Sequence, residues 1–250
     1  ALKMLALGTA WLGHRRVALA QLTSDQDDSG PWMRKEFPGL FYIVSPGGYG
    51  AATWTGINQV VLGIDNTTIS NRWLAENVQQ GHGPLGAVYP DVTWGMEGDT
   101  PSWLSLVPNG LSDPEHPEWG NWGGRFRRSG RGNEYVPAED LRDGRPDMLY
   151  TIHRWRTAYQ NAFEARMDWC VAEYHQANHN PVAIFMGDEN RTICRLQAQP
   201  GEHFELDASG SHDPDGDPLS YKWSLYPEAG TYAGQVSLED ATEPVAAITV

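Results

Sequence analysis

Two acidic residues, Glu97 and Asp99, flank Gly98 directly after a predicted strand over residues 92–96. Carboxylates two positions apart can accept hydrogen bonds from sugar hydroxyls, and the glycine lets the backbone come close to a ligand. Acids are also favourable at a helix start, because the helix dipole is positive there, and a short helix is predicted from Pro101. The motif therefore predicts either a substrate contact or a simple helix start, and the residue types leave both open.

A third acid, Asp168, lies midway along the clearest predicted helix of the chain, residues 153–178. Its sequence neighbours Met167 and Trp169 are apolar. A carboxylate beside an apolar stripe needs an arginine or a metal ion as its partner, unless it faces solvent. Asp168 is therefore a candidate metal ligand, with an exposed position on the helix as the alternative.

Two further stretches are rich in carboxylates. Residues 24–31 hold Asp25, Asp27 and Asp28 between a predicted strand and a predicted helix, and residues 207–218 hold acids at alternate positions around a glycine. Both offer oxygen ligands to a hard cation such as Ca²⁺. The residue types favour a solvated, helix-capping turn for the first stretch and a turn between strands for the second.

Residues 109–126 mix acids, a histidine, glycines and two tryptophans without the period of a helix or a strand. Flexible backbone beside aromatic rings and carboxylates is typical of a loop that contacts saccharides, with Trp119 and Trp122 as candidate contacts. The alternative is a surface loop packed by its own tryptophans. The chain has 11 tryptophans, and core packing explains many of them without any ligand.

Alternating strands and helices must position these residues. Strands are predicted at residues 17–22, 40–45, 92–96 and 182–186, and helices at residues 70–80, 101–107 and 153–178. This order favours an α/β fold with a mostly parallel sheet, in which ligand sites lie at the carboxyl ends of the strands. Residues 109–147 show little periodicity and are predicted to form a long loop.

The character of the sequence changes after Pro200-Gly201. Short alternating strands are predicted at residues 204–207, 221–226, 236–238 and 247–250, which is typical of a β-sandwich. Residues 196–250 also hold ten acids and one base, and such a shift in composition suggests a second domain. We therefore divide the chain into an α/β domain over residues 1–194 and an incomplete β-sandwich module over residues 195–250.

The chain of 250 residues has a formal net charge of −14. This charge argues against nucleic acid as a partner, because such binding depends on neutralising phosphates. No run of 18 apolar residues is present, so no membrane-spanning helix is expected. Cys170 and Cys194 do not make a disulfide framework, and one bridge or two free thiols are both open.

Three long stretches resemble the bacterial cellulose-binding protein family with a nucleoside-hydrolase-like domain: SDQDDSGPWMRKEFPGLFYIVSPG, MEGDTPSWLSLVPNGLSDPEHPEWGNWGGRF and RWRTAYQNAFEARMDWCVAEYHQANHNPV. A fourth, LDASGSHDPDGDPLSYKWSLYPEAGTY, resembles the start of the family's immunoglobulin-like module. The resemblance implies a secreted or envelope-associated relative of N-ribohydrolases. It also implies that the first strand of the domain and its aspartate cluster lie upstream, so that this chain corresponds to the later part of the domain.

In N-ribohydrolases the aspartate cluster holds Ca²⁺, which binds the sugar hydroxyls and lowers the pKa of the attacking water. By this resemblance Glu97, Asp99 and Asn109 would contact the sugar, and Asp168 would bind the metal ion. The resemblance therefore predicts hydrolysis of an N-glycosyl or other glycosidic bond in a nucleoside or carbohydrate. Because part of the metal site would lie upstream, this chain alone is expected to be a poor catalyst.

The cellulose-binding label of the family implies a different class of function. A non-catalytic carbohydrate-binding protein would stack the rings of Trp119 and Trp122 on the faces of sugar units. A purely structural protein of the cell envelope is a third interpretation.

Overall fold

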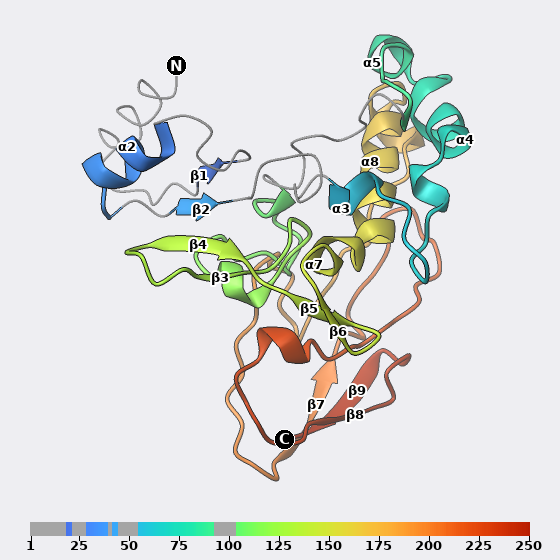
Figure 1. Ribbon diagram of the computed structural model, residues 1–250. Coiled ribbons are helices and arrows are strands. Elements are labelled where there is room, and N and C mark those ends of the chain that lie inside the picture. Colours follow the sequence, from blue (N-terminus) through green and yellow to red (C-terminus); the bar gives the residue numbers. More distant parts are fainter. Residues whose placement is uncertain (1–18, 22–28, 40–41, 45–54, 93–103) are drawn as a thin grey trace.

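The computed structural model describes residues 19–21, 29–39, 42–44, 55–92 and 104–250 (Figure 1). A four-stranded sheet has the order β1-β2-β4-β3. Its strands are β1 (Leu19–Gln21), β2 (Tyr42–Val44), β3 (Phe126–Arg128) and β4 (Glu134–Pro137). β1, β2 and β4 run parallel, and β3 pairs antiparallel with β4. The strands predicted at residues 17–22 and 40–45 are confirmed. The strand predicted at 92–96 lies, apart from Val92, outside the described residues, and the larger parallel sheet stays a prediction.

A small core covers this sheet. Ile43, Phe126 and Tyr135 pack together in it. Helix α2 (Ser29–Glu36) follows β1 and buries Met33. The guanidinium of Arg34 lies 3.3 Å from the buried carboxylate of Glu134. The helix predicted after the acidic loop is therefore present, and the ion pair of Arg34 with Glu134 links it to β4 of the sheet.

Short helical segments fill residues 55–87: α3 (Thr55–Asn58), η1 (Thr67–Ile69), α4 (Asn71–Leu74), η2 (Ala75–Gln79) and α5 (Gly83–Ala87). The helix predicted at residues 70–80 is confirmed as α4 followed by η2. Its cap is Ser70, whose hydroxyl accepts the N–H of Trp73 at 3.1 Å. Segment η2 is a π-helix, in which the N–H of Gln80 reaches the carbonyl of Ala75 at 3.0 Å.

The helix predicted at residues 153–178 is shorter than expected. The structure has α7 (Tyr150–His153), α8 (Arg156–Trp169) and a single turn η5 (Tyr174–Gln176). Val171 and Tyr174 continue the apolar spacing but are 51% and 79% exposed. Helical stability in a protein depends on packing an apolar face, so spacing alone does not extend α8 to this point.

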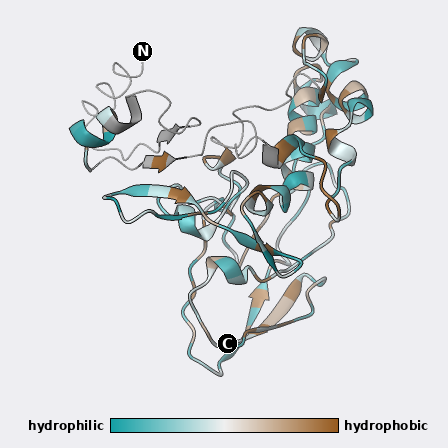
Figure 2. Ribbon diagram, in the orientation of Figure 1, coloured by the Kyte–Doolittle hydropathy of each residue, from teal (hydrophilic) through white to brown (hydrophobic). Residues whose placement is uncertain are grey.

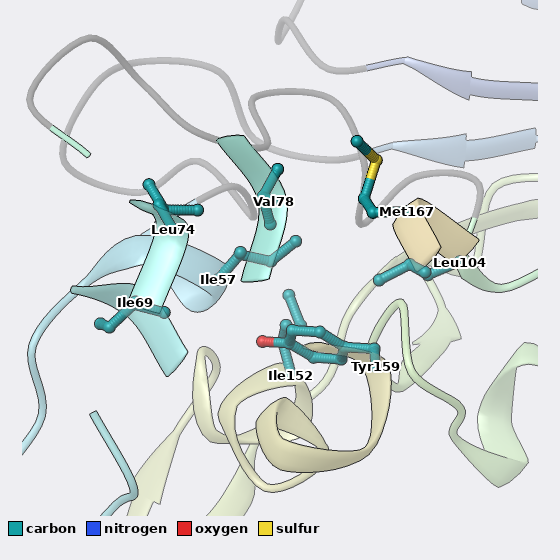
Figure 3. Packing of buried hydrophobic residues seen from close by; sticks show 8 residues of the cluster. All are labelled: Ile57, Ile69, Leu74, Val78, Leu104, Ile152, Tyr159 and Met167. Carbon is teal, nitrogen blue, oxygen red and sulfur yellow. The ribbon is translucent and has the colours of Figure 1, made fainter. Parts of the chain in front are cut away.

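The main hydrophobic core lies between α8 and the helical segments that precede it in the sequence (Figure 3). It is formed by Ile57, Ile69, Leu74, Val78, Leu104, Ile152, Tyr159 and Met167. Burying one such side chain fully stabilises the fold by roughly 1.5–3 kcal/mol. The buried guanidinium of Arg156 crosses the edge of this core, donating to the carbonyl of Gln59 at 2.8 Å and to Oδ1 of Asn66 at 3.0 Å.

The prediction of a long loop over residues 109–147 is wrong. This stretch contains β3, β4, the 3₁₀ turn η4 (Pro117–Trp119) and the hairpin of β5 (Asp140–Arg142) and β6 (Arg145–Asp147). The strands are three or four residues long and rich in charged side chains, so they show no hydrophobic alternation. The hairpin turns at Asp143 and Gly144, whose φ angles of 51° and 75° suit an Asp-Gly turn.

The C-terminal part of the chain, residues 195–250, contains an antiparallel sheet in the order β7-β9-β8. Its strands are β7 (His203–Asp207), β8 (Ser237–Glu239) and β9 (Val245–Thr249), which confirms three of the four predicted strands. Figure 2 shows β9 as a hydrophobic strand in a largely hydrophilic region. The immunoglobulin-like sandwich and the division at residue 195 stay predictions.

Two other predicted strands are wrong. Residues 221–226 form no strand, although the N–H of Trp223 donates to the carbonyl of Ala241 at 2.8 Å, and they lead into the 3₁₀ turn η6 (Pro227–Ala229). Residues 182–186 make only isolated bridges, from Val182 to His212 and from Phe185 to Asp188. Neither stretch lies beside a neighbouring strand long enough to form a ladder, so alternating side chains alone do not make a strand there.

Candidate functional site

A cavity of about 570 Å³ lies between α8 and the C-terminal part of the chain. We call it the junction cavity. Its walls come from residues 107–110 with Trp122, from one face of α8, from residues 178–183 and 189–191, and from the acidic turn near residue 215. The polar side chains among them are Asn109, Asn161, Arg166, Asn178, His179, Asn180, Glu189, Asn190, Arg191, Asp213 and Asp217. Amides, carboxylates and guanidinium groups thus line the same cavity as one tryptophan, Trp122.

Asn109 is the predicted site residue whose geometry is most specific. Its Oδ1 accepts the N–H groups of Leu111 at 3.0 Å and Ser112 at 3.1 Å, which fixes the orientation of the side chain. Its Nδ2 is buried and has no hydrogen-bond partner within the part of the chain that the structure describes. A buried donor without a partner is costly, so the amide of Asn109 is a polar group that the fold itself leaves unsatisfied.

Trp122, a predicted ligand-contacting residue, also lines the junction cavity, and its contact with a ligand stays a prediction. Its ring packs against the main core, and Trp122 also lines a neighbouring apolar cavity of about 320 Å³. A tight turn fixes its position, with reciprocal backbone hydrogen bonds of 3.1 and 3.0 Å between Asn121 and Gly124. Gly124 has a φ of +113°, and a Cβ there would lie 3.1 Å from Oγ1 of Thr151. The turn therefore requires glycine, and it holds the tryptophan rigidly.

Trp119 lies elsewhere. Its ring stacks on the imidazole of His116 with centroids 4.0 Å apart and planes 5° apart, and the guanidinium of Arg195 lies 4.6 Å from its centroid. Trp119 is not among the residues that line the junction cavity. The structure therefore does not bring Trp119 and Trp122 together into one stacking platform.

Asp168 has a histidine as its partner rather than the arginine considered from the sequence. Nε2 of His82, a buried residue, lies 2.8 Å from Oδ1 of Asp168. Burial and the negative charge of Asp168 raise the pKa of Glu164, one turn earlier on α8. The three residues form an acid–imidazole group on the side of α8 that faces α5.

Alone, this group supplies too few oxygen ligands for a calcium ion. Ca²⁺ takes six to eight oxygen ligands, whereas Oδ1 of Asp168 is engaged by an imidazole nitrogen. Among the described residues no three or more His, Cys, Asp or Glu side chains are arranged to hold a metal ion. Glu97, Asp99 and the acids at 25, 27 and 28 lie outside the described residues. Calcium binding by Asp168 therefore stays a prediction.

A buried ionic cluster, which the sequence does not suggest, joins the C-terminal part to the rest of the chain. The carboxylate of Asp140 is fully buried and accepts from Nε of Arg125 at 2.7 Å, Nη1 of Arg154 at 2.8 Å and the hydroxyl of Tyr226 at 2.6 Å. A buried charge is tolerated only when such donors replace water. Burial and the hydrogen bond to Asp140 raise the pKa of the Tyr226 phenol. Because Tyr226 is far from the others in sequence, no local motif could reveal the cluster.

Gly120 makes room for this contact. It has a φ of +79°, and a Cβ at this position would lie 2.6 Å from the ring of Tyr226. The guanidinium of Arg154 lies 4.1 Å from the centroid of the same ring. Glu228 adds a second link, accepting the N–H of Leu141 at 3.1 Å. The C-terminal part is therefore fixed against the hairpin of β5 and β6.

Within the described ranges, no helix is long and apolar enough to cross a membrane. Cys170 and Cys194 are both exposed and are not joined to each other in the structure.

Comparison with known proteins defines the class of the chain. The family described as cellulose-binding Sde182, nucleoside hydrolase-like domain, matches residues 15–126, and the C-terminal domain of cellulose-binding protein Sde0182 matches residues 203–250. The fold is therefore nucleoside hydrolase-like, as predicted. Both matches are to domains of cellulose-binding Sde182 proteins, so the chain is similar to this family over residues 15–126 and 203–250.

One solved structure extends the likeness over the whole chain. It is a nucleoside hydrolase-related hypothetical protein from Saccharophagus degradans that is associated with carbohydrate metabolism. The two proteins are 30% identical and superpose with a TM-score of 0.71 over 100% of this chain. The chain spans 66% of the length of that protein. No protein with curated annotation matches the chain.

Proposed function

We propose that the junction cavity binds a carbohydrate chain, with cellulose as the ligand that the family suggests. The observation that carries the proposal is the buried, unpartnered Nδ2 of Asn109 in a cavity that Trp122 also lines. A sugar presents hydroxyls around its edge and apolar C–H groups on its faces. One oriented donor beside one aromatic ring matches both of these surfaces.

The rest of the lining supports the same class of ligand. Asn161, Asn178 and Asn190 offer amides, each of which can donate and accept, and hydroxyl groups require both. Asp213 and Asp217 add acceptors, and Arg166 and Arg191 add donors. A volume of about 570 Å³ lies within the range of small-molecule sites. The opposite charges along the walls favour a neutral, hydroxyl-rich ligand over a strongly charged one.

Retention on insoluble cellulose and calorimetry with cellohexaose test the proposal. The Asn109→Asp variant keeps the oxygen that accepts from Leu111 and Ser112 but removes the donor, so we expect affinity to fall about tenfold, as for one lost buried hydrogen bond. We expect Trp122→Ala to weaken binding by about tenfold or more, because it removes the aromatic surface.

Trp119→Ala is the matched control, since Trp119 belongs to the same loop but does not line the cavity. We expect it to bind like the parent chain. Unchanged affinity in both the Asn109 and Trp122 variants would overturn the proposal. Loss of binding in the Trp119 variant alone would favour the stacking loop predicted from the sequence.

Hydrolysis of an N-glycosyl bond is the second candidate function. It is supported by the match of residues 15–126 to a nucleoside hydrolase-like domain, a range that includes Glu97 and Asp99. Its test measures release of base from purine and pyrimidine nucleosides with and without Ca²⁺, in the parent chain and in Glu97→Gln and Asp99→Asn. No release under any condition would remove this candidate, whereas release that requires both acids and Ca²⁺ would support it.

The proposed ligand also bears on location. Cellulose is a polymer outside the cell, so we infer a secreted or envelope-associated protein with an immunoglobulin-like module at its C-terminal end. Fractionation of the producing bacterium with an antibody to the chain tests the location. Recovery in the cytoplasm alone would contradict it.

A further inference from the structure

The acidic turn over residues 213–217 forms the C-terminal wall of the junction cavity. Asp213 and Asp217 line the cavity, and Asp215 stands between them. Oδ1 of Asp213 accepts the N–H of Asp215 at 2.8 Å, and Gly216 has a φ of +83° that suits glycine. The turn is therefore ordered by hydrogen bonds within itself, and its position against the rest of the cavity depends on what Asp215 contacts.

Asp215 binds the opposite wall through His179. Oδ2 of Asp215 accepts the backbone N–H of His179 at 2.6 Å, and Oδ1 lies 3.0 Å from the Nδ1 of the same residue. These contacts keep the pKa of Asp215 below its usual value, because the hydrogen bonds from His179 favour the carboxylate. One side chain thus makes a two-point contact between residues that are 36 positions apart in the sequence.

His179 is in turn fixed to the end of α8. Its ring lies 4.3 Å from that of Tyr174 and 6.4 Å from that of Trp169, measured between centroids. The indole N–H of Trp169 donates to the carbonyl of Asn178 at 2.7 Å. A continuous set of contacts therefore runs from the last residue of α8 through His179 to Asp215 and the acidic turn.

We propose that the carbohydrate site is composite and that Asp215 is its positioning residue. Asp215 holds the acidic turn against His179, so that Asp213 and Asp217 face the same ligand as Asn109 and Trp122. This inference rests on the function proposed above. It adds that the C-terminal part supplies one wall of the site and that Asp215 acts on the ligand only through the turn it holds.

The buried cluster around Asp140 makes the inference testable. It fixes the C-terminal part independently of His179, through the hydroxyl of Tyr226. Removing the carboxylate of Asp215 should therefore release the turn and leave the fold intact. Asn at the same position keeps an oxygen that can accept the backbone N–H of His179, so Asp215→Asn should rescue what Asp215→Ala loses.

The experiment compares Asp215→Ala and Asp215→Asn by calorimetry with cellohexaose and by hydrogen exchange of the peptide over residues 213–219. We expect the alanine variant to lose about tenfold in affinity and to exchange faster over these residues, with the asparagine variant within about threefold of the parent. Asp65→Ala is the matched control, because Asp65 also accepts a backbone and a side-chain donor, both from Thr67, but does not line the cavity.

The failure of this inference differs from the failure of the proposed function. If Trp122→Ala loses binding while Asp215→Ala binds like the parent, the cavity binds carbohydrate without the turn, and the composite site is overturned. If Asp215→Ala leaves hydrogen exchange over residues 213–219 unchanged, Asp215 does not position the turn, whatever the affinity. If both Trp122→Ala and Asp215→Ala bind like the parent, the proposed function and this inference fall together.

Discussion

His153 in α7 is a buried imidazole whose two ring nitrogens have no hydrogen-bond partner within the described part of the chain. Burial and the positive charge of Arg156 lower its pKa to about 4, against an opposing contribution from the carboxylate of Asp147. Such a histidine stays neutral in the folded protein under conditions where the unfolded chain would bind a proton. Protonation of this buried imidazole in the folded protein would therefore cost free energy.

This histidine makes stability depend on pH. Between its ordinary pKa of 6.5 and the folded value of about 4, the unfolded chain binds the extra proton. The free energy of unfolding should therefore be fully retained above pH 6.5 and should fall as the pH drops towards 4, by about 3 kcal/mol for this group. Urea unfolding at a series of pH values measures the loss.

Replacing His153 with phenylalanine identifies the source of the pH dependence. The ring fits a similar volume and has no group to protonate, so the variant should lose less stability between pH 6.5 and 4 than the parent. His175, which is exposed, provides the control variant His175→Gln. An unchanged pH dependence in His153→Phe would assign the loss to other groups.

Among the elements, the segment of α4 and η2 shows most directly how local sequence signals determine local structure. Ser70 caps the helix, as its position before the apolar spacing predicted, and its hydroxyl also donates to the carbonyl of Thr67 at 2.8 Å. The cap aligns Leu74 and Val78 with the main core, where both are fully buried (Figure 3).

Ser70→Ala should lower the free energy of unfolding by about 1 kcal/mol, the usual cost of losing a helix cap. Urea denaturation measures it, with an unchanged dependence on denaturant concentration because the fold is kept. Ser237→Ala in β8 is the control, since Ser237 is exposed and should stay within about 0.5 kcal/mol of the parent. Equal stability of the two variants would show that the cap contributes nothing.

Elements with local signals could be predicted, and those that depend on distant partners could not. The capped helix at Ser70 and the strand at Ile43 follow from spacing and turn residues nearby. The strands between residues 126 and 147 are short and charged, so their pairing depends on tertiary partners that no local pattern reveals. For the candidate site, Trp122 was proposed from residue type and Asn109 from the family resemblance, whereas the hydrogen bond of Asp215 to His179 joins residues 36 positions apart, which no local pattern reveals.

At the scale of the whole molecule, the contact of Tyr226 with Asp140 joins the C-terminal part to the rest of the chain. Three donors surround one carboxylate with no exposed surface, and two of them are guanidinium groups. Removal of one donor leaves the charge buried with weaker compensation, so its cost exceeds that of an exposed hydrogen bond.

Tyr226→Phe should therefore lower the free energy of unfolding by about 2 kcal/mol, as for a hydrogen bond to a charged group. Differential scanning calorimetry measures the change, with Tyr232→Phe as the control because Tyr232 is 51% exposed. A transition at the parent temperature in Tyr226→Phe would mean that the two arginines satisfy Asp140 alone.

The close fit of the Tyr226 ring over Gly120 has a consequence for how such proteins can be recombined. If the C-terminal part were fused to an unrelated domain, Tyr226 would face a surface without the equivalents of Gly120 and of the Asp140 carboxylate. A chimera should therefore tolerate an exchange of residues 195–250 only when Gly120 and the hairpin of β5 and β6 are exchanged together with them. The two sides of this contact are then expected to be inherited together.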